Sequence, residues 1–141
     1  MGLFSKVKQM FGGQTQPQPV RPPAPMAPEP EPGEIVVPEM TVAELRAALA
    51  CAAPPLILDI REQYEWNQVH IADVLHIPMN QVPERLADLP ADRPIAVLCA
   101  HGNRSYGVTH FLREQGLNAY NVTGGITRWH VQGGDVVVQT R

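Results

Sequence analysis

Two apolar segments constrain the fold of this chain more than any other feature of its sequence. Residues 56–60 are apolar apart from Asp59 and stop at Arg61, and residues 95–99 form a second such run that ends at Cys99. Strands that are covered on both faces read as continuous apolar runs, whereas half-exposed strands alternate between apolar and polar residues. The two segments therefore predict buried parallel strands at the centre of a sheet.

The segments around these runs predict an alternation of strands and helices over residues 34–141. Thr41 and Glu44 form a capping box, which predicts a helix that continues through Leu49. The pattern also predicts strands at 35–37 and 119–122, and helices at 83–89, from Ser105 to a capping Gly116, and at 126–131 after the Gly124-Gly125 turn. This order indicates an α/β domain with an open, mostly parallel five-stranded sheet and helices on both faces.

The N-terminal residues differ in composition from this domain. On a helix, five apolar side chains of residues 1–11 would share one face opposite two lysines: Leu3, Phe4, Val7, Met10 and Phe11, opposite Lys6 and Lys8. Such a helix predicts weak contact with a membrane surface or with a protein. Half of the residues from 17 to 32 are proline, so the Gly/Gln/Pro-rich residues 12–33 are expected to form a disordered, extended linker or, alternatively, a proline-rich ligand.

Charge and cysteine content exclude several classes of protein. A net charge of -3 and a pI near 5.9 indicate no basic surface for nucleic acid. Cys51 and Cys99 lie far apart, and neither belongs to a Cys-x-x-Cys pair, so no disulfide framework and no metal site is expected. No secretory signal and no apolar run near 20 residues is present. We expect a cytoplasmic protein, at most peripheral at a membrane surface.

The loop that follows the second apolar run contains the reactive groups. Cys99 ends a predicted strand, and the helix expected from Ser105 begins six residues later. Loop amides and the positive end of a helix dipole favour an anion at such a place, and Arg104 adds a positive charge, so we expect the pKa of Cys99 to be lowered. The loop therefore predicts a nucleophile; the alternative is a cysteine that is merely buried at a strand end. Cys51 is expected to be structural.

Four motifs, in order, resemble those of the rhodanese domains. Residues 99–105 (Cys-Ala-His-Gly-Asn-Arg-Ser) are similar to the family's active loop, and residues 59–65 contain its Asp-x-Arg motif followed by Tyr-Glu. Residues 69–78 are similar to the family's Gly-His-Ile-Pro-Gly-Ala-x-x-Ile-Pro, with Val69, Ala72 and Asp73 at three of the usual Gly and Pro positions. Residues 121–126 with Trp129 resemble the closing Gly-Gly turn and helix. The resemblance implies a single-domain thiosulfate sulfurtransferase.

The resemblance also implies roles for individual residues. Cys99 would take sulfane sulfur from thiosulfate or another persulfide donor and pass it to cyanide, a thiol or a protein cysteine. The remaining loop residues would bind the anionic donor: Ala100, His101, Gly102, Asn103, Arg104 and Ser105. For His101 the alternative is a histidine that is merely exposed in the loop. Asp59 and Arg61 would brace the loop as an ion pair or hydrogen-bonded set, and His70 would be a hydrogen-bonded structural histidine. No cofactor is implied.

Two other functions fit the same fold. One is a noncatalytic or carrier module that docks a partner protein, although such modules commonly lose the cysteine that is present here. The other is a phosphatase or arsenate reductase, because a related branch of the fold uses a Cys-x5-Arg loop. Four residues separate Cys99 from Arg104, and this shorter loop favours sulfur chemistry.

Overall fold

The structure of the chain is a computed structural model that describes residues 33–139. Within these residues the centre is a five-stranded sheet in the order β1-β6-β5-β2-β4, in which every neighbouring pair of strands is parallel. The strands are β1 (Glu39–Met40), β2 (Leu56–Asp59), β4 (Leu75–His76), β5 (Ile95–Leu98) and β6 (Ala119–Val122). The expected α/β architecture is confirmed, whereas the helix expected at 1–11 and the linker expected at 12–33 fall on residues outside the described part, except for Gly33.

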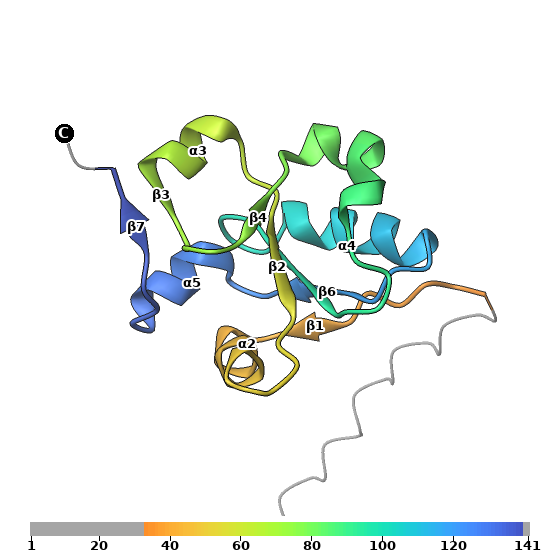
Figure 1. Cartoon of the computed structure of the whole chain (residues 1–141), viewed down its shortest axis with the longest axis horizontal. Coiled ribbons are helices and arrows are strands. Elements are labelled where there is room, and N and C mark those ends of the chain that lie inside the picture. The colour runs from red at the N-terminus through yellow and green to blue at the C-terminus, as the bar shows by residue number, and fades with distance from the viewer. Residues whose placement is uncertain (1–32, 140–141) are drawn as a thin grey trace, which may run out of the picture.

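Helices cover both faces of this sheet, as Figure 1 shows. Helices α2 (Val42–Leu49) and α5 (Gly125–Val131) lie on one face, and α4 (Arg104–Glu114) lies on the other with the 3-10 helix η1 (Met79–Asp88). Helix α3 (Gln63–Gln68) leads into β3 (Val69–His70), which pairs antiparallel with β7 (Val137–Val138) in a separate small sheet. None of the helices within residues 33–139 is long and apolar enough to span a membrane.

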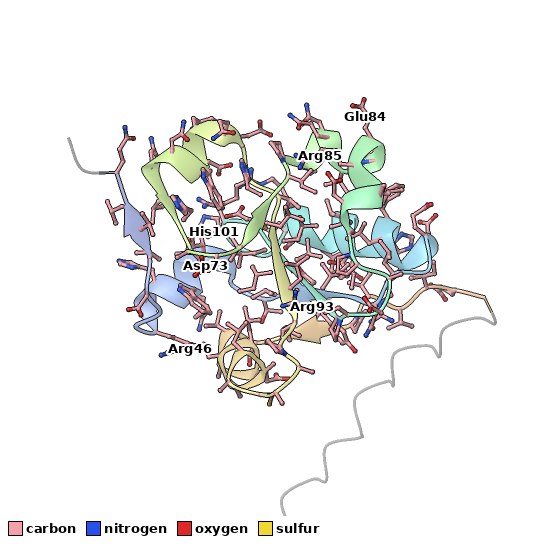
Figure 2. All side chains as sticks on the ribbon, in the orientation of Figure 1. Arg46, Asp73, Glu84, Arg85, Arg93 and His101 are labelled. Atoms are coloured by element: carbon pink, nitrogen blue, oxygen red, sulfur yellow. The ribbon has the colours of Figure 1, made fainter. Side chains whose placement is uncertain are left out.

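Successive residues of the central strands contribute to two separate cores. Ile57 of β2 packs with Val42 and Leu45 of α2, whereas its neighbour Leu58 packs with Leu112 of α4. This alternation follows from the strand geometry, in which consecutive side chains point to opposite faces. It explains why β2 and β5 are apolar at consecutive positions: both of their faces are covered. On the first face, Arg46 of α2 also donates to the Gln132 carbonyl oxygen at the end of α5, 2.8 Å away (Figure 2).

Three sequence-based boundaries need correction. The strand expected at 35–37 is wrong, because β1 pairs Glu39 with Asn121 and β6 begins at Ala119, which leaves no partner strand for residues 35 and 36. The helix expected at 83–89 is instead the 3-10 helix η1, which contains Pro83 and is kinked at Arg85. Helix α4 begins at Arg104, one residue before the expected start. Helix α3 and strands β3, β4 and β7 were not expected.

Candidate active site

The carboxyl ends of three neighbouring strands meet around Cys99. Cys99 directly follows β5, whose last residue Leu98 pairs with Asp59 at the end of β2. On the other side of β5, Val97 pairs with Asn121 of β6. Parallel register therefore brings Asp59 and Asn121, which are far apart in the sequence, to the same edge of the sheet as Cys99.

The sulfur of Cys99 lies at the N-terminus of α4, in the loop of residues 99–105 (the Cys99 loop). The backbone amides of Gly102 and Ser105 donate to Cys99 Sγ at 3.1 and 3.4 Å, and Ser105 Oγ is 3.2 Å from the same atom. The N-cap residue Asn103 makes no side-chain capping hydrogen bond. The sulfur thus accepts from the helix amide of Ser105, which a capping side chain would otherwise satisfy, and from the loop amide of Gly102.

This environment lowers the pKa of Cys99. Burial raises it, because a buried thiolate loses its hydration, but the amides of Ser105, Gly102 and His101, together with the Ser105 hydroxyl whenever it donates to the sulfur, outweigh that effect. The direction agrees with the expectation from the sequence. The main cause differs, since the largest contributions that lower this pKa are hydrogen bonds within the loop, and the charge attraction between Arg104 and Cys99 is not one of them.

A double-glycine turn holds the Cys99 loop from behind. Gly125 has φ +58, and a Cβ at this position would lie 2.3 Å from the carbonyl oxygen of Cys99 and 2.5 Å from that of Ala100. The two residues after Gly125 donate to the same carbonyl oxygens: Ile126 N to Cys99 O at 2.9 Å and Thr127 N to Ala100 O at 3.2 Å. The close approach therefore requires glycine and positions Cys99.

Arg104 forms an ion pair that the sequence analysis did not anticipate. Its two terminal nitrogens donate to the two carboxylate oxygens of Glu65 on α3, each at 2.8 Å. The hydrogen bond from Arg104, opposed by burial, holds the pKa of Glu65 below its ordinary value. Glu65 is the acidic residue of the Tyr-Glu pair after the Asp-x-Arg motif. The two ends of the pair come from separate motifs, and only the fold shows that they meet.

Asp59 and Arg61 form the expected buried ion pair, at the end of β2. Both side chains are almost fully buried, and Arg61 Nη2 lies 2.9 Å from Asp59 Oδ2. Arg61 also donates to the carbonyl oxygens of Val69 and Glu65, at 2.7 and 3.4 Å. The pair therefore connects the end of β2 to Glu65 within α3 and to Val69, which follows that helix.

Asn121 is a site residue that the sequence analysis quoted in a motif but did not assign a role. Its side chain is buried, accepts a hydrogen bond from Ser105 Oγ, and donates through Nδ2 to Gly102 O at 3.1 Å and to Glu39 Oε2 at 2.9 Å. The signal that could have found it is a single amide in an otherwise largely apolar strand.

The remaining residues of interest lie at the edge of the site or away from it. His101 is exposed in the Cys99 loop (Figure 2), as is Asn103, and Ala100 is half-buried. His70 is a hydrogen-bonded structural histidine, as expected: its Nδ1 bonds to Trp66 O at 2.9 Å and its ring stacks on Trp66. Cys51 is exposed, so the structure offers no core role for it. Within residues 33–139 no group of three His, Cys, Asp or Glu side chains is arranged to hold a metal ion.

Comparison with known proteins identifies the family. Residues 41–132 match the model of the rhodanese-like domain. A protein of Allochromatium vinosum named sulfurtransferase is 35% identical over 72% of this chain and 96% of its own length. The thiosulfate sulfurtransferase GlpE of Pseudomonas savastanoi is 31% identical over 60% of this chain and 80% of its own length. A rhodanese-related protein of Thermoplasma volcanium superposes with a TM-score of 0.67 at 35% identity, over 72% of this chain and 99% of its own.

The fold and the site thus define a parallel α/β domain with a cysteine loop at the carboxyl edge of its sheet. The chain belongs to the rhodanese-like domain family, in which relatives are named sulfurtransferases.

Proposed function

We propose that this protein is a sulfurtransferase that carries sulfane sulfur on Cys99 as a persulfide. The observation that carries the proposal is the placement of Cys99 Sγ, which receives two backbone amides at the N-terminus of α4. The similarity to proteins named sulfurtransferase and thiosulfate sulfurtransferase supports it. An environment that stabilises negative charge on this sulfur suits both a thiolate nucleophile and an anionic persulfide.

The first half-reaction loads the cysteine. The Cys99 thiolate attacks the outer sulfur of thiosulfate, a sulfur–sulfur bond forms to Cys99, and the sulfur–sulfur bond of thiosulfate breaks, so that sulfite leaves with the electron pair. In the second half-reaction an acceptor anion such as cyanide or a thiolate attacks the outer sulfur of the persulfide, and the Cys99 thiolate is released. Atoms and charge balance in each step, and neither step needs a cofactor.

The protein contributes binding and charge stabilisation to these steps. The persulfide places its negative charge on the outer sulfur, beside a loop whose amides of His101, Gly102 and Ser105 already favour negative charge at Cys99. Arg104, at the start of α4, adds a positive charge. Because its guanidinium is already bound to Glu65 through both terminal nitrogens, the amides carry most of the contact with the donor, and Arg104 acts mainly by long-range attraction.

A mass measurement tests the proposal directly. After incubation with thiosulfate, the intact protein is expected to gain one sulfur atom, about 32 Da, and to lose it again on treatment with cyanide. The Cys99→Ser variant is expected to show neither the gain nor thiocyanate production, whereas Cys51→Ser, the matched control at the exposed cysteine, keeps both. Equal loss in the two folded variants, or a gain that persists in Cys99→Ser, would overturn the assignment of the nucleophile.

A further inference from the structure

The side chain of Asn121 determines where the hydroxyl proton of Ser105 points. Its Nδ2 group faces two atoms that can only accept, the Gly102 carbonyl oxygen and the Glu39 carboxylate, at 3.1 and 2.9 Å. The amide must therefore present Oδ1 to Ser105. Because Oδ1 can only accept, the short contact between Ser105 Oγ and Asn121 Oδ1 must be a hydrogen bond donated by the serine hydroxyl.

Cys99 competes with Asn121 for that proton. Ser105 Oγ is 3.2 Å from Cys99 Sγ, and a hydroxyl has only one hydrogen to donate. While the proton points to Asn121, Ser105 presents a lone pair to the sulfur. That arrangement accepts a hydrogen bond from the neutral thiol and repels the thiolate. The amides of Gly102 and Ser105 favour the thiolate in either case, so the hydroxyl is the adjustable part of the environment.

We propose that Asn121 is a positioning residue that withholds the Ser105 proton from the sulfur of Cys99 and so favours the sulfur-loaded state over the empty thiolate. The inference rests on the proposed role of Cys99 as the sulfur carrier. In the empty site, a thiolate has to draw the Ser105 proton away from Asn121. In the loaded site, Cys99 Sγ is bonded to the outer sulfur and carries neither a proton nor the charge, so the hydrogen bond between Ser105 and Asn121 remains intact at no cost.

Other charged groups near the site do not replace this hydrogen bond. Most of the charged side chains on the surrounding elements already have a partner. Asp59 is paired with Arg61 and Glu65 with Arg104, and Glu39 of β1 is bound to Asn121. Two more lie in the loops and helices beside Cys99: the exposed His101, and Arg128 of α5, whose side chain lies over Gly124. Among the described residues, the Ser105 hydroxyl, 3.2 Å from the sulfur, is the group whose proton can turn toward or away from it.

The pH dependence of Cys99 alkylation tests the inference without any sulfur donor. The parent protein is the Cys51→Ser variant, so that iodoacetamide reports on Cys99, and intact mass follows the reaction. Three variants are compared with it: Asn121→Leu, Ser105→Ala, and the two combined. Burial slows alkylation in every case, so the ratio between variants is the quantity measured, first below the pKa of Cys99 and then on the high-pH plateau.

The inference predicts a reversal of sign for the serine. Asn121→Leu frees the proton to reach the thiolate, and alkylation at low pH is expected to become about tenfold faster, an effect that vanishes on the high-pH plateau. Ser105→Ala alone is expected to be no slower than the parent. In the Asn121→Leu background the same serine change is expected to slow alkylation by about tenfold.

Opposite results overturn the inference. If Ser105→Ala alone slows alkylation at low pH severalfold, the hydroxyl already donates to the sulfur in the parent, and Asn121 does not withhold it. A folded Asn121→Leu variant that reacts at the parent rate is equally decisive. If Asn121→Leu fails to fold by circular dichroism, the Ser105→Ala result alone decides. Because alkylation needs no thiosulfate, a failure of sulfur loading would instead count against the proposed function.

Discussion

Replacement of Gly125 by alanine would test how the Gly-Gly turn positions Cys99. The residue has φ +58, and its Cβ would lie 2.3 Å from Cys99 O and 2.5 Å from both the carbonyl carbon and the oxygen of Ala100. The left-handed conformation costs an alanine about 1–2 kcal/mol, and overpacking against backbone costs roughly another 1–3 kcal/mol. We therefore expect Gly125→Ala to lower the free energy of unfolding by about 2–5 kcal/mol.

Gly116→Ala is the matched control, because the two costs can be separated in it. Gly116 has φ +83, and a Cβ there meets no atom within 4 Å, so this variant is expected to lose only the conformational part, about 1–2 kcal/mol. Urea unfolding, followed by tryptophan fluorescence and extrapolated to water, measures both variants.

The activities of these two variants separate positioning from stability. The clash must move the backbone of Cys99 and Ala100 and thereby misalign the sulfur with the amides of Gly102 and Ser105. A misplacement of about 1 Å at a reacting group costs roughly 100-fold in rate, so sulfur transfer from thiosulfate to cyanide is expected to fall by up to about that factor in Gly125→Ala and to stay unchanged in Gly116→Ala. Equal losses of stability and activity in the two variants would refute the reasoning.

Three further predictions concern the ion pairs and the N-terminal residues. Asp59→Asn leaves Arg61 without its carboxylate in a buried site and is expected to lower the free energy of unfolding in urea by about 3–5 kcal/mol. Asp88→Asn, in an exposed ion pair, should change it by less than about 0.5 kcal/mol. Similar losses in the two variants would contradict the argument from burial. Because the pKa of Glu65 is held below its ordinary 4.5, its ion pair with Arg104 stabilises the fold above that pH and loses this effect as the pH falls through the lowered pKa. Glu65→Gln should therefore remove part of the decline in the urea midpoint at acid pH. An unchanged decline would speak against this role of the pair. Deletion of residues 1–33 should leave sulfur transfer in solution nearly unchanged and abolish salt-sensitive co-sedimentation with anionic vesicles; if the intact protein does not sediment with them, a protein-docking helix is the better account.

Local sequence was sufficient to predict the central elements of the fold. Continuous apolar runs identified β2 and β5, because a strand covered on both faces must be apolar at consecutive positions. The capping box of Thr41 and Glu44 placed the start of α2, and the structure contains both of its hydrogen bonds. The Cys99 loop was recognisable because an N-terminal helix turn, a glycine and an arginine occur within a few residues of one cysteine. Each of these signals lies within a short stretch of chain, so no knowledge of distant contacts is needed to read it.

The contacts that complete the candidate site depend on tertiary structure. Glu65 reaches Arg104 across 39 positions in the sequence, and Asn121 reaches Glu39 across 82; nothing in the local pattern of either residue specifies the partner. Strand β1 begins later than expected because its register is determined by β6. These features are properties of which strand ends meet at the carboxyl edge of the sheet, and that meeting exists only after the chain has folded. A single sequence therefore indicates which cysteine is the candidate nucleophile. The groups that contact Ser105, the Cys99 loop and Arg104 follow instead from the packing of elements far apart in the chain.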